Sequence, residues 1–357
     1  MCMFYHVITH TACNLSCKYC DRDDFGPPDE ETYDYNVPST IQYNIGSLHS
    51  LVTKDDYVTF YGGEPLLGMD EVRNIMDNVV CKGFMIQTNG LLLHRLGLSY
   101  VNRFHTILVS IDGDAESTDK NRGKGIHKAV MDNVRFIKEQ GFNGELIARM
   151  TITQGSSVYN QVRWLIDNGF DNVHWQLDAM FYEGCDNNWL EDYNKEITQL
   201  LEYWFSEMKK GKVLRLYPFL VVMDSMLRGE KSRLRCGSGF SNYTITPNGN
   251  IAPCPIMANM KKYYCGDIEN NELKKMSCDN EPCSSCEVLD LCGGRCLYVN
   301  LTQKGGNKAY EEVCKTVKHL ISSLQMAKPM VEDLIEKEII RLEDFFHLKY
   351  NGVEVIP

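Results

Sequence analysis

The sequence has too few basic residues for a protein that binds a nucleic-acid backbone. Its 37 Lys and Arg are outnumbered by 48 Asp and Glu, which gives a formal net charge of -11, whereas phosphate binding needs Lys and Arg concentrated on one face. The chain also lacks any run approaching the roughly 20 apolar residues of a membrane span. Its N-terminus has no basic segment followed by an apolar stretch. We therefore expect no nucleic-acid or membrane partner, and a cytoplasmic location.

Internal repeats and low-complexity tracts are absent as well. The 357 residues suffice for two to three domains, and 43% apolar with 24% charged residues is ordinary for a globular protein. What the chain does have is cysteine, with 15 residues. In a reducing cytosol this content indicates metal or redox chemistry, because disulfide frameworks belong to short, loop-rich exported chains.

Three cysteines form an early constellation, Cys13-x3-Cys17-x2-Cys20. Thiolates so close in sequence can hold three corners of an iron-sulfur cube and leave the fourth iron open for a ligand. With no histidine among them, they would make a poor closed zinc site. The early constellation therefore favours an iron-sulfur cluster with one vacant position.

A late constellation contains seven more cysteines: Cys236, Cys254, Cys283, Cys286, Cys292, Cys296 and Cys314. Seven thiolates exceed one tetrahedral site, so they imply at least two metal centres if all of them ligate. Taken alone, this pattern fits a pair of zinc ribbons as well as iron-sulfur clusters. The early constellation favours iron and sulfur. Cys2, Cys81 and Cys185 are interpreted as small apolar residues.

Apolar runs typical of strands alternate with segments of helical period up to residue 177. Strands are expected at Phe4 to Thr9, Tyr57 to Tyr61, Phe84 to Thr88, Ile107 to Ile111, Leu146 to Thr151 and Val173 to Leu177. Helices are expected at Ser39 to Leu51, Asp70 to Val80 with Asp70 as N-cap, Leu91 to Leu98, His127 to Gln140 and Ser157 to Asn168. This α/β alternation implies a parallel sheet, either an open partial barrel or a doubly wound sheet, with binding loops at the carboxyl ends of its strands.

The pattern changes after the sixth strand. A long amphipathic helix is expected at Trp189 to Lys210, and a second helix around Phe219 to Arg228. From Cys236 to Cys314 little periodicity remains, which indicates loops held by metal rather than by a large core. Helical period returns at Tyr310, and we expect Pro329 to interrupt that helical tail.

The early motif resembles the signature of the radical S-adenosylmethionine (SAM) enzymes, whose fold is a partial (β/α)6 TIM-like barrel. Cys13, Cys17 and Cys20, with Tyr19 before the last cysteine, match the segment that binds the SAM cluster. Residues that the resemblance implies in SAM binding are Tyr19, Gly62, Gly63, Glu64, Ser110, Asp112 and Arg149. Within this set, Gly62-Gly63-Glu64-Pro65 resembles the segment that holds the methionine amino group of SAM. Ser110 and Asp112 resemble the segment that lies near the ribose and carboxylate of SAM. Arg149 matches an arginine that helps to bind the methionine carboxylate in related maturases.

The late constellation resembles the SPASM domain, which carries two auxiliary 4Fe-4S clusters. The resemblance implies Cys236, Cys254 and Cys296 at the first auxiliary cluster, and Cys283, Cys286, Cys292 and Cys314 at the second, so that the chain would hold three 4Fe-4S clusters and SAM. The first set has only three members, because residues 237–240 contain no cysteine where some relatives supply a fourth. Cys265, Cys278 or a substrate thiolate are the alternatives for the open iron.

The same resemblance suggests a barrel at residues 1–212, a helical linker at 213–235, a SPASM domain at 236–315 and a helical tail at 316–357. It implies that SAM is cleaved reductively to a 5'-deoxyadenosyl radical, which oxidatively modifies a side chain of a ribosomal peptide or protein by a thioether or carbon-carbon crosslink. An external reductant such as a flavodoxin or ferredoxin would supply the electrons. No residue is indicated as the catalytic acid or base.

Two alternatives stay open: a radical SAM enzyme acting on a small molecule or RNA, and a non-catalytic, metal-stabilised electron-transfer or binding protein. The acidic charge balance weighs against RNA. Pro255 stands where sulfatase-maturing relatives have an aspartate, which disfavours that group. Only twelve residues precede Cys13, so we expect no N-terminal peptide-recognition domain. The compact size and the opening Met3-Phe4-Tyr5-His6 resemble an archaeal group of peptide-modifying members.

Overall fold

The computed structural model describes residues 2–20, 31–178, 187–270, 272–278, 280–303, 306–352 and 354. Cys185, interpreted above as a small apolar residue, lies outside these ranges. The chain divides into two compact units. The first unit contains Met1–Ile111, Ala115–Ile147 and Gly237–Met276, and the second contains Asp112–Asp114, Ala148–Cys236 and Ser277–Pro357. None of the helices in the described ranges combines the length and apolar character needed to cross a membrane.

The strands of the first unit form a mainly parallel sheet in the order β10-β9-β8-β1-β2-β3-β4. They are β1 Phe4–His10, β2 Tyr57–Gly62, β3 Gly83–Thr88, β4 Phe104–Ser110, β8 Asn242–Ile245, β9 Asn250–Ala252 and β10 Gly266–Asp267. β1 pairs in parallel with both β2 and β8, whereas β9 is antiparallel to β8 and β10. The run from β1 to β4 follows the chain order without a reversal, which favours the barrel over the doubly wound alternative.

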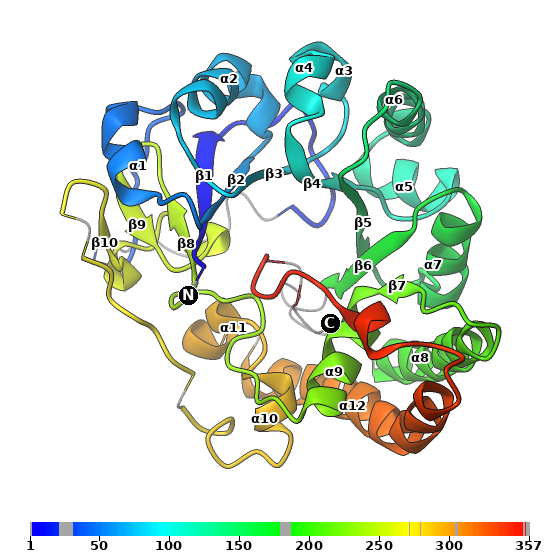
Figure 1. Cartoon of the computed structure of the whole chain (residues 1–357). Coiled ribbons are helices and arrows are strands. Elements are labelled where there is room, and N and C mark those ends of the chain that lie inside the picture. Colours follow the sequence, from blue (N-terminus) through cyan, green and yellow to red (C-terminus); the bar gives the residue numbers. More distant parts are fainter. Residues whose placement is uncertain are drawn as a thin grey trace. The chain divides into compact units, whose positions relative to one another are not determined.

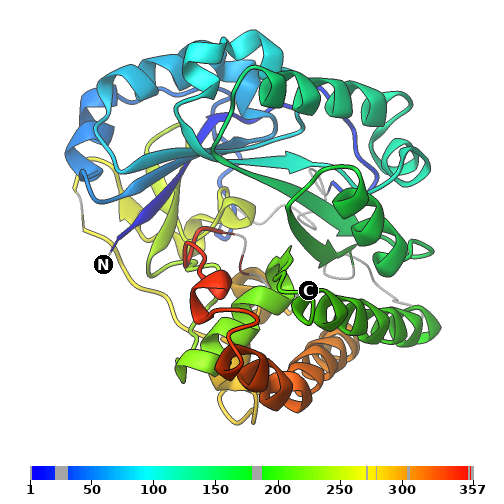
Figure 2. The same ribbon diagram turned by 45° about the vertical axis from the view of Figure 1, so that its right-hand side comes forward.

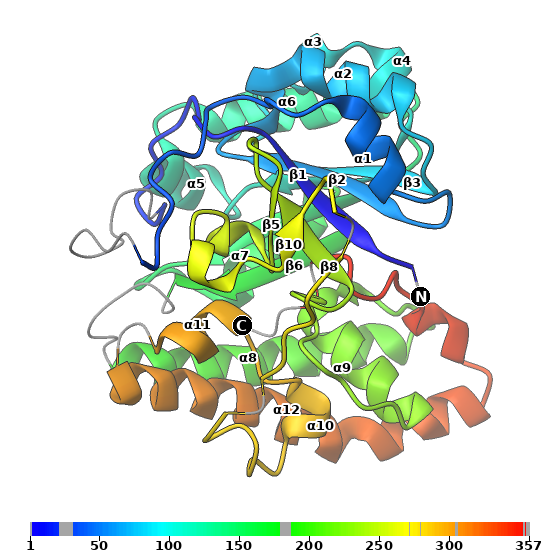
Figure 3. The same ribbon diagram turned by 90° about the vertical axis from the view of Figure 1, so that its left-hand side faces the viewer.

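Helices of the first unit lie along the outer side of β1 to β4, as Figures 1 and 3 show for α2, α3, α4 and α6. The helices are α1 Ile45–Leu51, α2 Met69–Asn78, α3 Leu93–Leu96, α4 Leu98–Val101, α5 Ala115–Arg122 and α6 Ile126–Glu139, and the 3-10 turns are η1 Pro65–Gly68, η3 Pro255–Met257 and η4 Lys261–Tyr263. Val130, Val134 and Ile137 of α6 recur at helical spacing and are buried. Such apolar faces build the core that supports the loops at the strand ends.

The six predicted strands are present, with ends that differ by up to three residues, but the first predicted helix starts too early. α1 begins at Ile45 and not at Ser39, because Thr40 is paired with His10 in a β-bridge. Asn44 then caps the helix, its side chain accepting a hydrogen bond from the main chain. A contact between distant segments therefore overrides the local helical pattern.

Two other helix predictions are wrong in detail. Asp70 is not an N-cap, because α2 already begins at Met69 and Asp70 lies in its first turn. The single helix expected at Leu91 to Leu98 is two short ones, because Gly97 adopts a φ of 95° between α3 and α4. α5 was not predicted at all, and its mostly polar sequence lacks a clear apolar face.

The second unit is mostly helical. Its helices are α7 Val158–Asp167, α8 Asn187–Met208, α9 Tyr217–Arg228, α10 Leu289–Cys292, α11 Leu297–Thr302 and α12 Gly306–Glu336, followed by the 3-10 turn η5 at Leu342–Phe345. Its strands β6 Asn172–Leu177 and β7 Arg215–Leu216 pair in parallel, and β5 Glu145–Ile152 contains the division between the units. Figures 2 and 3 show α8 and α12 side by side, and α12 also contacts α9.

Pro329 does not interrupt the C-terminal helix, contrary to the prediction, because α12 continues through it to Glu336. A proline inside a helix removes one backbone hydrogen bond. Leu324 before it, and Val331 and Leu334 after it, are all buried. Packing of this face outweighs the local cost of the proline.

Candidate cofactor and metal sites

The early cysteine loop (residues 11–20) begins at the carboxyl end of β1, where parallel sheets place their binding loops. Two of its thiols, on Cys13 and Cys17, are partly exposed, and the third, on Cys20, is exposed. The Leu15 N–H donates to the Cys13 Sγ at 3.4 Å. Accessible thiols with a nearby backbone donor suit a cluster that keeps one iron open to a ligand.

The end of α5 holds the second half of this loop. The Lys18 N–H donates to the Asn121 carbonyl at 2.9 Å. The Arg122 guanidinium lies 5.3 Å from the centre of the Tyr19 ring, within the range of a cation-π interaction. Tyr19, a predicted SAM contact, is thus supported by Arg122, which the sequence did not indicate because α5 was not predicted.

Gly62 and Gly63 allow the end of β2 to pass very close to the early loop. A Cβ on Gly62 would lie 2.1 Å from the His10 carbonyl oxygen, and one on Gly63 would lie 2.4 Å from the Ala12 carbonyl oxygen. Gly62 also has a φ of +149°, which other residues rarely adopt. Both positions therefore require glycine, and together they fix the backbone that leads into Cys13.

Glu64 is fully buried, and both of its carboxylate oxygens accept hydrogen bonds within the protein. Oε1 accepts from the Thr88 hydroxyl at 2.7 Å and the Leu66 N–H at 3.0 Å, and Oε2 accepts from the Asn89 N–H at 2.8 Å. Burial raises the pKa of Glu64, and these hydrogen bonds oppose the rise because they favour the charged form. Asn89 Nδ2 in turn donates to Asn14 Oδ1 at 2.7 Å. Glu64 thus joins the end of β2 to the end of β3 and, through Asn89, to the early loop.

The remaining predicted SAM contacts are divided between the units. Ser110 ends β4 in the first unit, whereas Asp112 and Arg149 belong to the second. Asp112 is buried, and its Oδ1 accepts from the Thr151 N–H of β5 at 3.0 Å. Arg149, also on β5, donates from Nη2 to Gln176 Oε1 of β6 at 3.2 Å. Asp112, which follows β4, is therefore bound to β5 at Thr151, two residues after Arg149.

Asp178, directly after β6, was not among the predicted site residues. It is buried, and its Oδ1 has no hydrogen-bond partner within the described part of the chain. Burial, and after it the nearby Asp112 carboxylate, raises the pKa of Asp178 to about 6. Its place at the end of a predicted strand was the only signal in the sequence, since the proximity to Asp112 arises from the fold.

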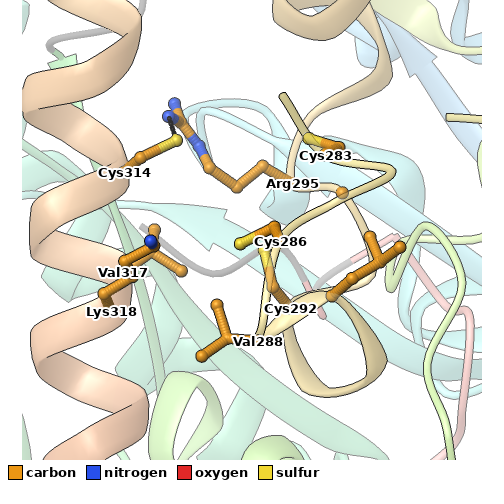
Figure 4. Close-up of a pocket in the computed structure, with 10 residues that line it drawn as sticks. Cys283, Cys286, Val288, Cys292, Arg295, Cys314, Val317 and Lys318 are labelled. Atoms are coloured by element: carbon orange, nitrogen blue, oxygen red, sulfur yellow. Dashed lines mark hydrogen bonds between the residues drawn. The ribbon is translucent and has the colours of Figure 1, made fainter. Parts of the chain in front are cut away.

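Four late cysteines line one pocket of the second unit, which we call the four-cysteine pocket. They are Cys283, Cys286, Cys292 and Cys314. The first two precede α10, the third is its last residue, and the fourth lies on α12. Figure 4 shows the thiols of Cys286 and Cys314 pointing into the space between the α10 segment and α12. The structure thus brings together the four residues that the sequence predicts for one cluster.

The surroundings of the four-cysteine pocket combine apolar walls with two cations. The apolar residues are Val288, Leu289 and Val317. The cations are Arg295, whose Nη1 donates to the Cys314 Sγ at 3.5 Å, and Lys318, which pairs with Glu287 at 3.0 Å. Positive charge and N–H donors beside thiolates stabilise an anionic cluster and tune its potential.

The donor set of the four-cysteine pocket suits an iron-sulfur cluster, because it consists of thiols. A 4Fe-4S cluster takes four thiolates on its several irons. The Cys283 Sγ also lies 3.0 Å from the Tyr310 hydroxyl and 3.2 Å from Asn300 Nδ2. Such bonds to sulfur are the outer-shell contacts that tune a cluster.

The predicted ligands of the first auxiliary cluster are divided between the units. Cys254 lies in the first unit, and Cys236 and Cys296 lie in the second; all three are buried. Burial chiefly, and the nearby Cys236 thiol to a lesser degree, raises the pKa of the Cys296 thiol, so these two cysteines are neighbours. Of the two alternatives for a fourth ligand, Cys265 belongs to the first unit and Cys278 to the second.

Comparisons with known proteins give a matching family model and similar proteins. The family model described as the Radical SAM superfamily matches residues 7–158. The radical SAM cyclopropyl synthase TigE of Paramaledivibacter caminithermalis is 24% identical in an alignment 365 residues long. That alignment covers 89% of this chain and 73% of TigE. A cysteine-type anaerobic sulfatase-maturating enzyme of Clostridium perfringens is 20% identical over 322 residues, which cover 80% of this chain and 86% of that enzyme.

Solved structures show the same fold. Tagged anSMEcpe with bound AdoMet, which is SAM, has a TM-score of 0.72 at 19% identity, covering 97% of this chain and 99% of that chain. Native anSMEcpe with bound AdoMet and the Cp18Cys peptide has a TM-score of 0.69 at 19% identity, covering 94% and 99%. The fold is accordingly the mixed α/β fold of the partial TIM-barrel radical SAM type, with a helical C-terminal region.

Proposed function

Because residues 7–158 of this chain form a radical SAM domain, we propose that the enzyme cleaves SAM reductively and uses the 5'-deoxyadenosyl radical to oxidise a peptide or protein side chain. The observation that carries the oxidative part is the four-cysteine pocket, which is separate in sequence from the early loop. Cys13, Cys17 and Cys20 would hold the SAM cluster. A second thiolate set is of use where electrons must leave the substrate as well as reach SAM.

The residues around the early loop would bind and orient SAM. Cys13, Cys17 and Cys20 would hold a cluster that, when reduced, would supply the electron for splitting the sulfonium bond of SAM. Gly62 and Gly63 bring the backbone of β2 against the loop. Glu64 acts as a positioning residue, because its own oxygens are engaged by the chain.

The oxidation removes two hydrogens from the substrate when a new bond joins two of its atoms. One leaves as an atom and becomes part of 5'-deoxyadenosine, and the other leaves as a proton while its electron passes to an acceptor. The four-cysteine pocket would hold that acceptor as a 4Fe-4S cluster. Arg295, beside the Cys314 Sγ, favours the reduced and more negative state of such a cluster.

The names of the relatives support a peptide or protein substrate and, within that class, ring or crosslink formation. The anSMEcpe structure holds the Cp18Cys peptide, and a relative over 80% of this chain matures sulfatases. TigE is a cyclopropyl synthase, and making a cyclopropane ring requires a new carbon-carbon bond. The formal charge of -11 argues against RNA as the substrate. An external flavodoxin or ferredoxin would supply the electrons.

The proposal is tested with the anaerobically reconstituted enzyme. Incubation with SAM and dithionite should yield 5'-deoxyadenosine, and the iron content should approach about 12 per chain, for three clusters of four irons. The open reading frames beside the gene are searched for a short peptide, which is then co-expressed with the enzyme and weighed. A loss of two mass units is expected for a crosslink or a ring. Modification of a small molecule, with the peptide unchanged, would contradict the proposed substrate class.

A further inference from the structure

We propose that Cys278 is a ligand of the first auxiliary iron-sulfur cluster, together with Cys236 and Cys296. This inference rests on the proposed function only in requiring that the enzyme carries auxiliary clusters. All three cysteines belong to the second unit and are buried, with exposed fractions of 6% for Cys278 and 8% for the other two. The sequence left Cys278, Cys265 and a substrate thiolate as alternatives, and the geometry of the second unit distinguishes among them.

Main-chain contacts place Cys236 beside the loop that leads to Cys296. The Leu234 N–H donates to the Gly293 carbonyl at 2.7 Å. The Arg235 Nε donates to the Leu291 carbonyl at 2.5 Å. Leu234 is therefore bound to the loop that begins at Cys292 and ends at Cys296, and Arg235 is bound to the residue just before that loop.

Cys278 packs on the same loop from another segment. A Cβ on Gly294 would lie 2.8 Å from the Cys278 Cβ and 3.3 Å from its Sγ. Gly294 also has a φ of +89°, so both this backbone conformation and the close approach of Cys278 favour glycine there. It stands two residues before Cys296. The Cys292 to Cys296 loop thus contacts Cys278 through Gly294 and the segment before Cys236 through Gly293.

A purely structural role is the alternative for any buried cysteine, and Cys278 differs from the structural thiols of this chain. The thiols of Cys265 and Cys81 each donate to a carbonyl two residues away, at 3.6 Å and 3.5 Å. Within the described residues, no such hydrogen bond is recorded for Cys278. Cys278 instead packs against Gly294, which lies between two cysteines that are predicted to bind clusters.

The test compares Cys278→Ser with Cys265→Ser in a full-length chain that also carries Cys13→Ala, Cys17→Ala and Cys20→Ala, so that only auxiliary clusters contribute. Iron content and the electron paramagnetic resonance spectrum of the reduced protein are measured after anaerobic reconstitution. We expect Cys278→Ser to lose up to about 4 of about 8 irons, or to show one altered cluster signal. Cys265→Ser should match its parent. Unchanged iron and spectrum in Cys278→Ser would overturn the inference.

A second measurement needs no change at Cys278 and serves if that variant is insoluble. The parent with three Ala substitutions is alkylated once with its iron bound and once after a chelator has removed the iron, and the labelled cysteines are identified by mass spectrometry. We expect Cys278 to be labelled only after the iron is removed, because a ligating thiolate is not free to react. Labelling of Cys278 while the auxiliary iron stays bound would overturn the inference. Absence of auxiliary iron in that parent would instead refute the proposed auxiliary clusters themselves, so the two failures are distinguishable.

Discussion

The early loop and the four-cysteine pocket both present thiols, but they are built in different ways. The early loop is shaped by the fold, through close backbone approaches at Gly62 and Gly63 and the buried carboxylate of Glu64. Its own thiols are partly or fully exposed. The four-cysteine pocket lies instead between a short helical segment and α12 and has apolar walls (Figure 4).

This difference predicts different dependences on metal. A loop anchored by backbone hydrogen bonds to a parallel sheet should keep its conformation without a cluster. Among the described residues of the segment from Ser277 to Cys296, the four-residue α10 is the only helix, so ligation there would replace packing. Loss of the early cluster should therefore abolish chemistry at little structural cost, whereas loss of a late cluster should also destabilise the second unit.

The largest expected effect is on chemistry. Replacing Cys13, Cys17 and Cys20 together by Ala should abolish 5'-deoxyadenosine formation, because no thiolate would remain to hold the SAM cluster. The iron content should fall by about 4 of about 12, and the thermal midpoint should change by less than roughly 3 °C. Chromatographic assay of 5'-deoxyadenosine with dithionite checks the first expectation. Continued SAM cleavage by this variant would refute the assignment of the early loop.

The next effect is on stability. Cys314→Ala removes the α12 ligand of the four-cysteine pocket and should lower iron by about 4 per chain. It should also lower the free energy of unfolding by about 3 kcal/mol or more, because metal binding there is coupled to folding. Calorimetry under anaerobic conditions measures the midpoint, and Cys81→Ala, which removes a thiol outside both constellations, is the control. Equal midpoints and iron contents for the two variants would mean that Cys314 is not a ligand.

A third variant tests the backbone contact that shapes the early loop. Gly62→Ala would place a Cβ 2.1 Å from the His10 carbonyl oxygen, and nothing but backbone movement can relieve that overlap. We expect SAM cleavage to fall at least roughly tenfold and stability to fall by about 2 kcal/mol. Gly155→Ala is the matched control, because Gly155 also has a positive φ, +84°, but its Cβ would meet no atom within 4 Å. Similar losses in both variants would assign the effect to φ alone.

Short-range sequence patterns predicted the parallel strands and the cysteine groups, because both depend on spacing along the chain. Thus Cys283, Cys286 and Cys292 lie close in sequence and converge on one pocket. Short-range patterns did not predict that β8 pairs with β1, since the paired residues Asn242 and Phe4 are far apart in sequence. For the same reason they could not choose between Cys265 and Cys278 as a cluster ligand.

The smallest expected effect concerns Asp178, whose neighbour Asp112 also became apparent only in the fold. Burial and Asp112 raise the pKa of Asp178 from an ordinary 3.8 to about 6. Between pH 3.8 and about pH 6, the folded chain keeps a proton on Asp178 that the unfolded chain has released, so stability falls as pH rises. Above about pH 6, Asp178 is charged in both states, and its burial beside Asp112 destabilises the fold by a constant amount.

Asn cannot ionise, so Asp178→Asn should be more stable than the natural enzyme above this pH window. The gain should be roughly 1 to 2 kcal/mol, since one unit of pKa corresponds to about 1.4 kcal/mol and solvent reduces the full value. Anaerobic denaturant titrations at pH 5 and pH 8 should show the advantage growing with pH. Exposed Asp171→Asn is the control and should show no such growth. An advantage of the same size at both pH values would mean that the charge of Asp178 is not its cause, and that the like-charged pair with Asp112 has no effect on folding.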